Sequence, residues 1–81
     1  MAKLIEDTKV IIRLKEMRAV RNLSQGKVAV LCEMSVSNLQ QYEHGKMKSI
    51  PFKTLEKFCR VLKCQPGDLI VLESDEETAT E

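Results

Sequence analysis

The 81 residues are enough for one small domain with a single hydrophobic core, and they exclude a second domain. With only 3 glycines, 2 prolines and 4% aromatic residues, and with apolar residues recurring at helical spacing, the chain predicts an all-α fold. The net charge of +1 is uneven, because residues 73–81 carry five of the 12 acids and no base, which leaves residues 1–72 at net +6. The basic residues 1–72 suit a polyanionic partner. The acidic end has the composition of a solvated, disordered tail, and the second interpretation is that it competes with that partner for the basic surface.

Residues 10–21 predict an amphipathic first helix, because their apolar residues recur every three or four positions and charged residues fill the remaining faces. The expected apolar stripe consists of Val10, Leu14, Met17 and either Val20 or Arg21. Residues 1–9 have no clear pattern and are assigned to an N-terminal arm, with an edge strand as the alternative.

Ser24 and Ser35 are good N-caps for two further short helices, with a turn between them at Glu33 and Met34. Gly45 is the natural end of the third helix. The inward residues of the second helix are expected to be Val28, Ala29 and Cys32, and those of the third Leu39, Tyr42 and Glu43. The opposite face of the third helix is polar and almost uncharged, and consists of Val36, Ser37, Gln40, Gln41 and His44.

A basic loop, KMKSI, leads to Pro51, which fits the first turn of a fourth helix. A short fifth helix or turn is expected at Pro66 to Asp68, after which Leu69 to Leu72 closes the core or runs out as a strand. The domain is therefore assigned to residues 10–72 and the acidic tail to residues 73–81. The apolar stripe of the fourth helix would be Phe52, Leu55, Phe58, Cys59 and Leu62.

The three cysteines, Cys32, Cys59 and Cys64, are an odd number without a CxxC pair, so neither a disulfide framework nor a zinc site is indicated. The N-terminus mixes charges too early for a secretory signal, and no apolar run is long enough to span a bilayer. We expect a soluble protein of the reducing cytoplasm, with no metal and no cofactor. An enzyme is disfavoured because His44 is the single histidine and no nucleophile and base are suitably spaced.

The outward face of the third helix has the side chains that reading of the DNA major groove requires. Glutamine can pair with both N6 and N7 of adenine, and serine can donate or accept a hydrogen bond, whereas a charged face would bind phosphates with little discrimination among bases. A solvated helix face of no function explains the same composition equally well.

The spacing of several residues favours DNA binding. The stretch L-K-E-M-R-x-x-R-N-L-S-Q-x-x-x-A, followed by S-x-S-N-L-Q-Q-Y-E-H-G-K, resembles the Cro and phage-repressor (Xre) helix-turn-helix family without a gap from Leu14 to Lys46. The resemblance continues through TLEKFCRVLKCQPGDL and covers roughly residues 10–72. It implies a compact five-helix, lambda-repressor-like domain, with short terminal strands allowed, whose third helix, at about residues 35–44, enters the major groove.

The resemblance also implies roles for individual residues. Val36, Ser37 and Gln41 would face bases, and Arg18 of the first helix would pair with Glu43 to fix the angle of the reading helix. DNA phosphates would be contacted by Gln25, Lys46 and Lys48. The alternative for Gln25 is a hydrogen bond to the backbone at the helix start, and for the two lysines ordinary solubility.

Three positions depart from the family pattern. Gly26 weakens the first turn of the second helix by up to about 1 kcal/mol. Glu33 replaces a usual glycine, so a left-handed backbone there would cost roughly 1–2 kcal/mol. Val36 replaces a polar residue, and either contacts a thymine methyl group or reads nothing.

The sequence thus favours a transcription regulator, a repressor, that binds double-stranded DNA as a homodimer. The alternative is a protein-interaction module of the same fold, such as an antitoxin-like partner. Val30 and Leu31 are apolar where solvent is expected, so either a partner or second subunit covers them, or they pack against the first helix or the N-terminal arm.

Overall fold

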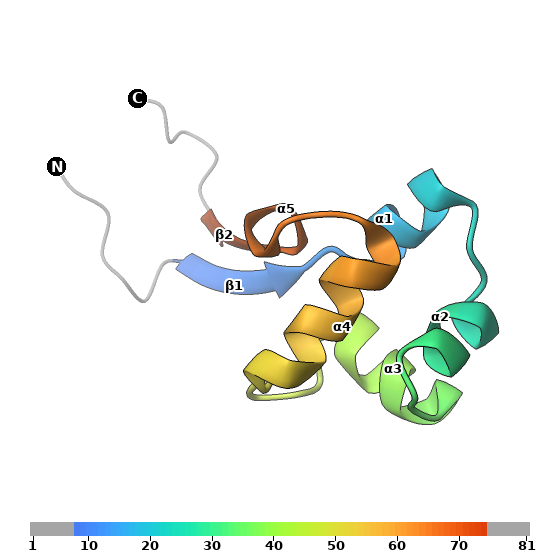
Figure 1. The fold of residues 1–81 in the computed structure, drawn as a ribbon. Helices are drawn as coiled ribbons and strands as arrows, with labels where there is room; N and C mark the ends of the chain where they lie inside the picture. The colour runs from blue at the N-terminus through green and yellow to red at the C-terminus, as the bar shows by residue number, and fades with distance from the viewer. Residues whose placement is uncertain (1–7, 75–81) are drawn as a thin grey trace, which may run out of the picture.

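The structure is a computed structural model that describes residues 8–74. Within them, five helices pack together and a two-stranded antiparallel ribbon extends from one side of the bundle, as Figure 1 shows. The expected all-α class with short terminal strands is confirmed. The elements are β1 (Thr8–Ile12), α1 (Leu14–Arg21), α2 (Gln25–Leu31), α3 (Val36–Glu43), α4 (Phe52–Leu62), α5 (Pro66–Leu69) and β2 (Ile70–Ser74).

The first helix begins at Leu14, so the expectation that it starts at residue 10 is wrong. Val10 to Ile12 are three consecutive β-branched residues, which favour a strand, and β1 pairs them with β2 in the register Val10↔Leu72 and Ile12↔Ile70. The edge-strand alternative for the N-terminal segment therefore holds from Thr8. The remainder of the arm, residues 1–7, lies outside the described residues.

The acidic tail begins later than residue 73, where the sequence predicts it. Glu73 and Ser74, assigned to the acidic tail, belong to β2, and residues 75–81 lie outside the described part of the chain. Of the segment expected to close the core, Leu69 is buried, whereas Leu72 is exposed on the ribbon. The residues Ile70 to Leu72 thus belong to the strand, and of the three Ile70 also packs against the core.

The core draws on all five helices, and most of the predicted inward residues lie in it. Phe58 and Tyr42 meet edge to face with ring centroids 5.5 Å apart, which joins α3 to α4. One expectation fails, because Phe52, the first residue of α4, is exposed. Of the two residues left open for the stripe of α1, Arg21 is half-buried and Val20 is exposed. The buried apolar residues are Leu14, Val28, Ala29, Cys32, Leu39, Tyr42, Phe58, Leu62 and Leu69.

Four of the helices end in the same way, with one residue in the left-handed conformation. The next residue then donates its backbone N–H to the carbonyl five positions earlier, with N···O distances of 2.9–3.1 Å. Gly45 (φ 69°) ends α3 as predicted and adopts this conformation without strain. The other three such residues are Asn22, Glu33 and Lys63. Glu33, with φ 59°, therefore has the strained backbone that its position predicted.

Replacing Glu33 by glycine should raise the free energy of unfolding by about 0.5–1 kcal/mol, because glycine adopts a positive φ without strain. The gain is reduced by the greater freedom of glycine in the unfolded chain and by loss of the exposed ion pair with Lys57, whose Nζ lies 3.2 Å from Glu33 Oε1. Glu33→Gln removes the charge alone and should change stability by less than about 0.5 kcal/mol. Urea denaturation of both variants measures this, and a less stable Glu33→Gly would contradict it.

Candidate nucleic-acid interface

α2 and α3 form a compact unit in which both N-caps act as the sequence predicts. Ser24 Oγ accepts a hydrogen bond from the backbone N–H of Lys27, and Ser35 Oγ accepts one from that of Asn38, each at 3.0 Å. Each cap satisfies an amide that the helix itself cannot pair. The left-handed Glu33 reverses the chain between the helices, so only four residues lie between the end of α2 and the start of α3.

α3 has one buried face and one exposed face. Leu39 and Tyr42 lie in the core, and Ser35 to Asn38, Gln41 and His44 are exposed. The exposed face therefore contains Val36, Ser37 and Gln41, as the helical spacing requires. Gln40 differs from the expectation, since it is half-buried and bonded to α2 rather than free on the outward face.

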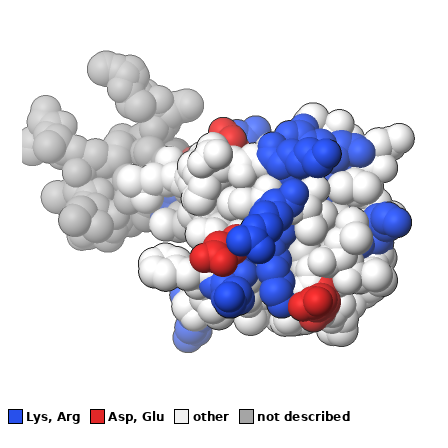
Figure 2. Space-filling model, viewed as in Figure 1, with Lys and Arg blue, Asp and Glu red and all other residues white. Residues whose placement is uncertain are grey.

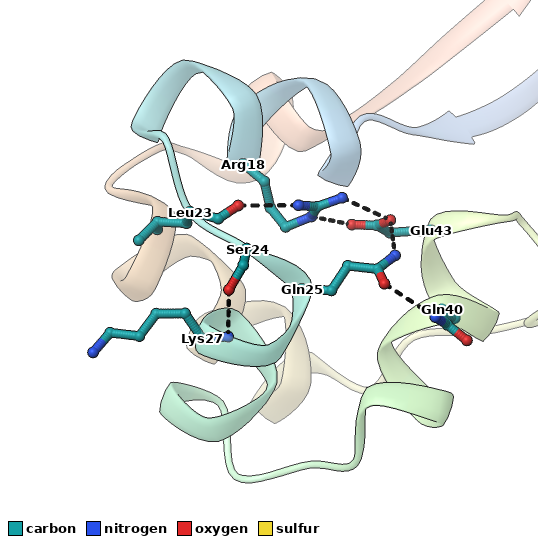
Figure 3. Close-up of polar contacts among 7 residues, drawn as sticks. All are labelled: Arg18, Leu23, Ser24, Gln25, Lys27, Gln40 and Glu43. Carbon is teal, nitrogen blue, oxygen red and sulfur yellow. Dashed lines mark hydrogen bonds and ion pairs between the residues drawn. The ribbon is translucent and has the colours of Figure 1, made fainter.

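A network of polar side chains links α1, α2 and α3 (Figure 3). Arg18 binds Glu43 with two of its nitrogens, and its Nη1 donates to the carbonyl of Leu23 at 3.0 Å. Gln25 Nε2 donates to Glu43 Oε1 at 2.9 Å, and Gln40 Nε2 donates to Gln25 Oε1 at 3.0 Å. The network thus connects the side of α1 to the first residue of α2 and to the last turn of α3.

The network holds a carboxylate that water barely reaches. The side chain of Glu43 is 2% exposed and that of Arg18 14%. Burial alone would raise the pKa of Glu43, but the hydrogen bonds from Arg18 and Gln25 and the positive charge of Arg18 outweigh it, so the pKa lies below its ordinary value. Glu43 is therefore ionised at neutral pH and attracts α1 to the end of α3.

The structure brings Arg18 and Glu43 together, and it adds contacts that the sequence does not predict. Gln25 donates to Glu43, the carbonyl of Leu23 accepts from Arg18, and Gln40 joins the network through Gln25. The available signal was the spacing of Gln40 and Glu43, because residues three apart on a helix share a side and can reach the same partner. Here that partner is Gln25.

The residues assigned to phosphate contacts occupy two different environments. Gln25 is half-buried, and its side chain bonds to Glu43 and Gln40 rather than to the backbone. Its amide nitrogen carries two hydrogens, and the contact with Glu43 uses one of them. Lys46 and Lys48 are exposed in the loop that follows Gly45. The loop begins at the end of α3, because the backbone N–H of Lys46 donates to the carbonyl of Gln41 at 2.9 Å.

Other surfaces of the bundle carry charge as well. Figure 2 shows Lys and Arg side chains gathered in a band over the region of α4. Lys57 and Arg60 of α4 line a shallow groove with Leu31, Glu33 and Val61. Leu31 in this groove is 48% exposed, and its neighbour in the sequence, Val30, is 73% exposed. The basic character of the body is therefore not confined to the α2–α3 unit.

In residues 8–74, no helix is long and apolar enough to cross a membrane. Two short capped helices joined by a tight turn, the second with a polar outward face, define a helix-turn-helix DNA-binding domain. The family model of the Cro/C1-type HTH DNA-binding domain matches residues 13–75. The chain belongs to this family.

Two similar proteins agree with that assignment. The uncharacterized HTH-type transcriptional regulator YozG of Bacillus subtilis (strain 168) is 38% identical over 69 residues, which cover 85% of this chain and 82% of that protein. The crystal structure of the transcriptional regulator VanUg superposes with a TM-score of 0.66 and 21% identity, covering 93% of this chain and 100% of the other. At that identity the second likeness supports the fold alone.

Proposed function

We propose that the protein is a transcriptional repressor that binds a specific double-stranded DNA sequence by inserting α3 into the major groove. The observation that carries the proposal is the division of α3 into two faces. Leu39, Tyr42 and Glu43 hold one face against the bundle, and the other face exposes amide and hydroxyl side chains with no competing charge nearby on the helix. Such groups form hydrogen bonds with base edges.

The proposed contacts divide between bases and phosphates. Val36, Ser37 and Gln41 read bases from the exposed face, and Val36 contacts a thymine methyl group. Lys46 and Lys48 bind phosphates from the loop beyond α3. Gln25 also contacts a phosphate through the amide hydrogen that Glu43 does not use, while its other bonds hold it in place. The Arg18–Glu43 pair does not touch DNA and sets the angle of α3.

Binding to duplex DNA at several salt concentrations tests the proposal. Fluorescence anisotropy with a pool of random duplexes should give an affinity that falls as salt rises, because lysines that neutralise phosphates release counterions. Selection of bound duplexes from the same pool should then return a preferred sequence. Salt-independent binding, or enrichment of no sequence, would contradict the proposal.

We propose further that the DNA-bound form is a homodimer whose two α3 helices lie about 34 Å apart, one turn of B-DNA. One reading helix covers too few base pairs for high specificity, and exposed apolar residues remain for an interface. Leu69 is not among them because it is buried, but Val30, Leu31 and Leu72 are exposed. Sedimentation at micromolar concentration with the selected duplex should show two protomers per duplex. A single protomer per duplex, at all concentrations, would refute the dimer.

The groove lined by Leu31 and Val61 favours a second candidate function, an interaction module that binds another regulator there. Its apolar residues are flanked by Lys57 and Arg60, which suits an acidic partner segment. Replacing Leu31 by serine would weaken the binding of such a partner and leave DNA affinity unchanged, whereas changes on α3 would do the reverse. The repressor proposal is preferred because the Cro/C1-type HTH DNA-binding family model covers residues 13–75 and because the exposed face of α3 presents amide and hydroxyl groups suited to base edges.

A further inference from the structure

Cys59 and Cys64 lie together at the C-terminal end of α4. Lys63 adopts the left-handed conformation, and the backbone N–H of Cys64 donates to the carbonyl of Cys59 at 3.1 Å. In this type of helix end, the side chains of the two bonded residues contact each other. The same geometry at the end of α2 brings Met34 back to Ala29, where the residues are ordinary apolar ones.

The backbone hydrogen bond limits the distance between the two cysteines. Even with every bond in line, standard bond lengths added to that hydrogen bond separate the Cα atoms by at most about 7.3 Å, and the angles at each bond shorten this. Disulfides form at Cα separations of about 4.4–6.8 Å. The two thiols are close enough that each influences the pKa of the other, in keeping with the backbone contact between their residues.

Solvent reaches this pair, although it does not reach the third cysteine. Cys59 lines a surface groove with Phe52, Leu55, Glu56, Arg60 and Pro66, and Cys64 is half-buried. Cys32 is fully buried in the core. An oxidant in water therefore meets Cys59 first.

We infer that Cys59 and Cys64 form a peroxide-oxidisable thiol pair, which hydrogen peroxide converts into an intramolecular disulfide within the native fold. Cys59 loses its thiol proton, the resulting thiolate attacks one oxygen of the peroxide, the O–O bond breaks, and hydroxide leaves as water after taking up that proton. The sulfur of Cys64 then attacks the resulting sulfenic acid, its proton is lost, and the sulfenic oxygen leaves as water. Two thiols are thereby oxidised and one peroxide is reduced to two waters.

The reactivity of the pair suits sustained rather than brief exposure to oxidant. Burial raises the pKa of both thiols, so both are protonated at neutral pH and attack is slow. In a reducing compartment the thiols are the resting state. The bond would fix the α4–α5 junction, where the carbonyl of Lys63 also accepts a hydrogen bond from Arg21 Nη2 of α1 at 3.0 Å.

Trypsin digestion of the peroxide-treated full chain tests the inference directly. Cleavage after Lys57, Arg60 and Lys63 places the two cysteines in separate peptides, Phe58–Arg60 and the one that begins at Cys64. We expect these two peptides to remain joined until a reductant is added, and Cys32 to react with an alkylating agent only after unfolding. Peptides that never appear joined, or a disulfide between two chains in their place, would overturn the inference.

Two further measurements distinguish a preorganised pair from a distorted one. The oxidised protein should unfold several degrees higher than the reduced one, because a disulfide that fits the native cap restricts only the unfolded chain. A lower midpoint would show that the bond forms only by disrupting α4 and would contradict the inference. Cys59→Ser should abolish both the joined peptides and the shift, and Cys32→Ala should preserve both.

Discussion

Replacing Glu43 by glutamine should lower the free energy of unfolding by about 3 kcal/mol. The substitution keeps the shape of the side chain but removes its charge, and it leaves the guanidinium of Arg18, whose side chain is 14% exposed, without its counter-ion. Arg18→Met should have a similar effect, because it leaves the Glu43 carboxylate, 2% exposed, without its main donor. Urea denaturation of each single variant measures these losses.

Two comparisons show whether the loss of stability comes from the buried pair or would follow from any substitution in the fold. The double variant Arg18→Met with Glu43→Met should lose much less unfolding free energy than the sum of the losses in the two single variants, because no isolated buried charge remains. Lys57→Met breaks an ion pair of similar composition, but its partner Glu33 is 77% exposed, so the loss should stay below about 1 kcal/mol. Single variants of Arg18 and Glu43 as stable as the parent would refute the role of the pair.

The pair should also make stability depend on pH. Because the pKa of Glu43 in the folded protein lies below its ordinary value of 4.5, its ionised form stabilises the fold. That contribution is complete above the unfolded-state pKa and is lost as the pH falls through the folded-state pKa. The difference in unfolding free energy between the parent and Glu43→Gln should therefore be constant from about pH 6 to 8 and shrink below about pH 4. A difference that grows in acid would contradict the direction of the shift.

Most of the helical framework could be predicted from the sequence, because it rests on local signals. Ser24, Ser35 and Gly45 mark helix ends through their own side-chain or backbone chemistry, and they act as predicted. Apolar spacing identified the inward residues of α2 and α3. These signals lie within a few residues of the structure that they determine.

The failures have a common physical cause, which is that the deciding partner lies far along the chain. Val10 fits a helical stripe with Leu14, but its partner is Leu72 of β2, a strand that begins sixty positions later. Gln40 looks like an outward amide until Gln25 approaches it from α2. Phe52 fits the spacing of the α4 core stripe but lies at the first residue of the helix, where no other element covers it. The spacing of apolar residues shows which face of a helix is apolar, but it does not show how much of that face the neighbouring elements cover.

Gln41→Ala should weaken binding to the preferred DNA sequence by about 1–3 kcal/mol and relax the base preference at one position. Gln41 is exposed on α3 and, within residues 8–74, makes no side-chain hydrogen bond, so its amide is free to pair with a base edge. It carries no charge, so the dependence of affinity on salt should hardly change. Anisotropy titrations with the selected duplex and its single-base variants measure both quantities.

Lys46→Ala should have the opposite signature. Lys46 lies just beyond α3, where its backbone N–H closes the helix on Gln41, and its exposed ammonium is available to phosphate. Its loss should weaken all duplexes to a similar extent and reduce the salt dependence by about one counterion, while the base preference remains. Lys63→Gln is the matched control. Lys63 lies at the C-terminal end of α4, and the length of that helix, about 16 Å, separates it from the basic loop. Its replacement should alter neither the affinity for duplexes nor the salt dependence. If Gln41→Ala leaves every base preference intact, then α3 is not the reading helix, and the interaction module becomes the better account of this surface.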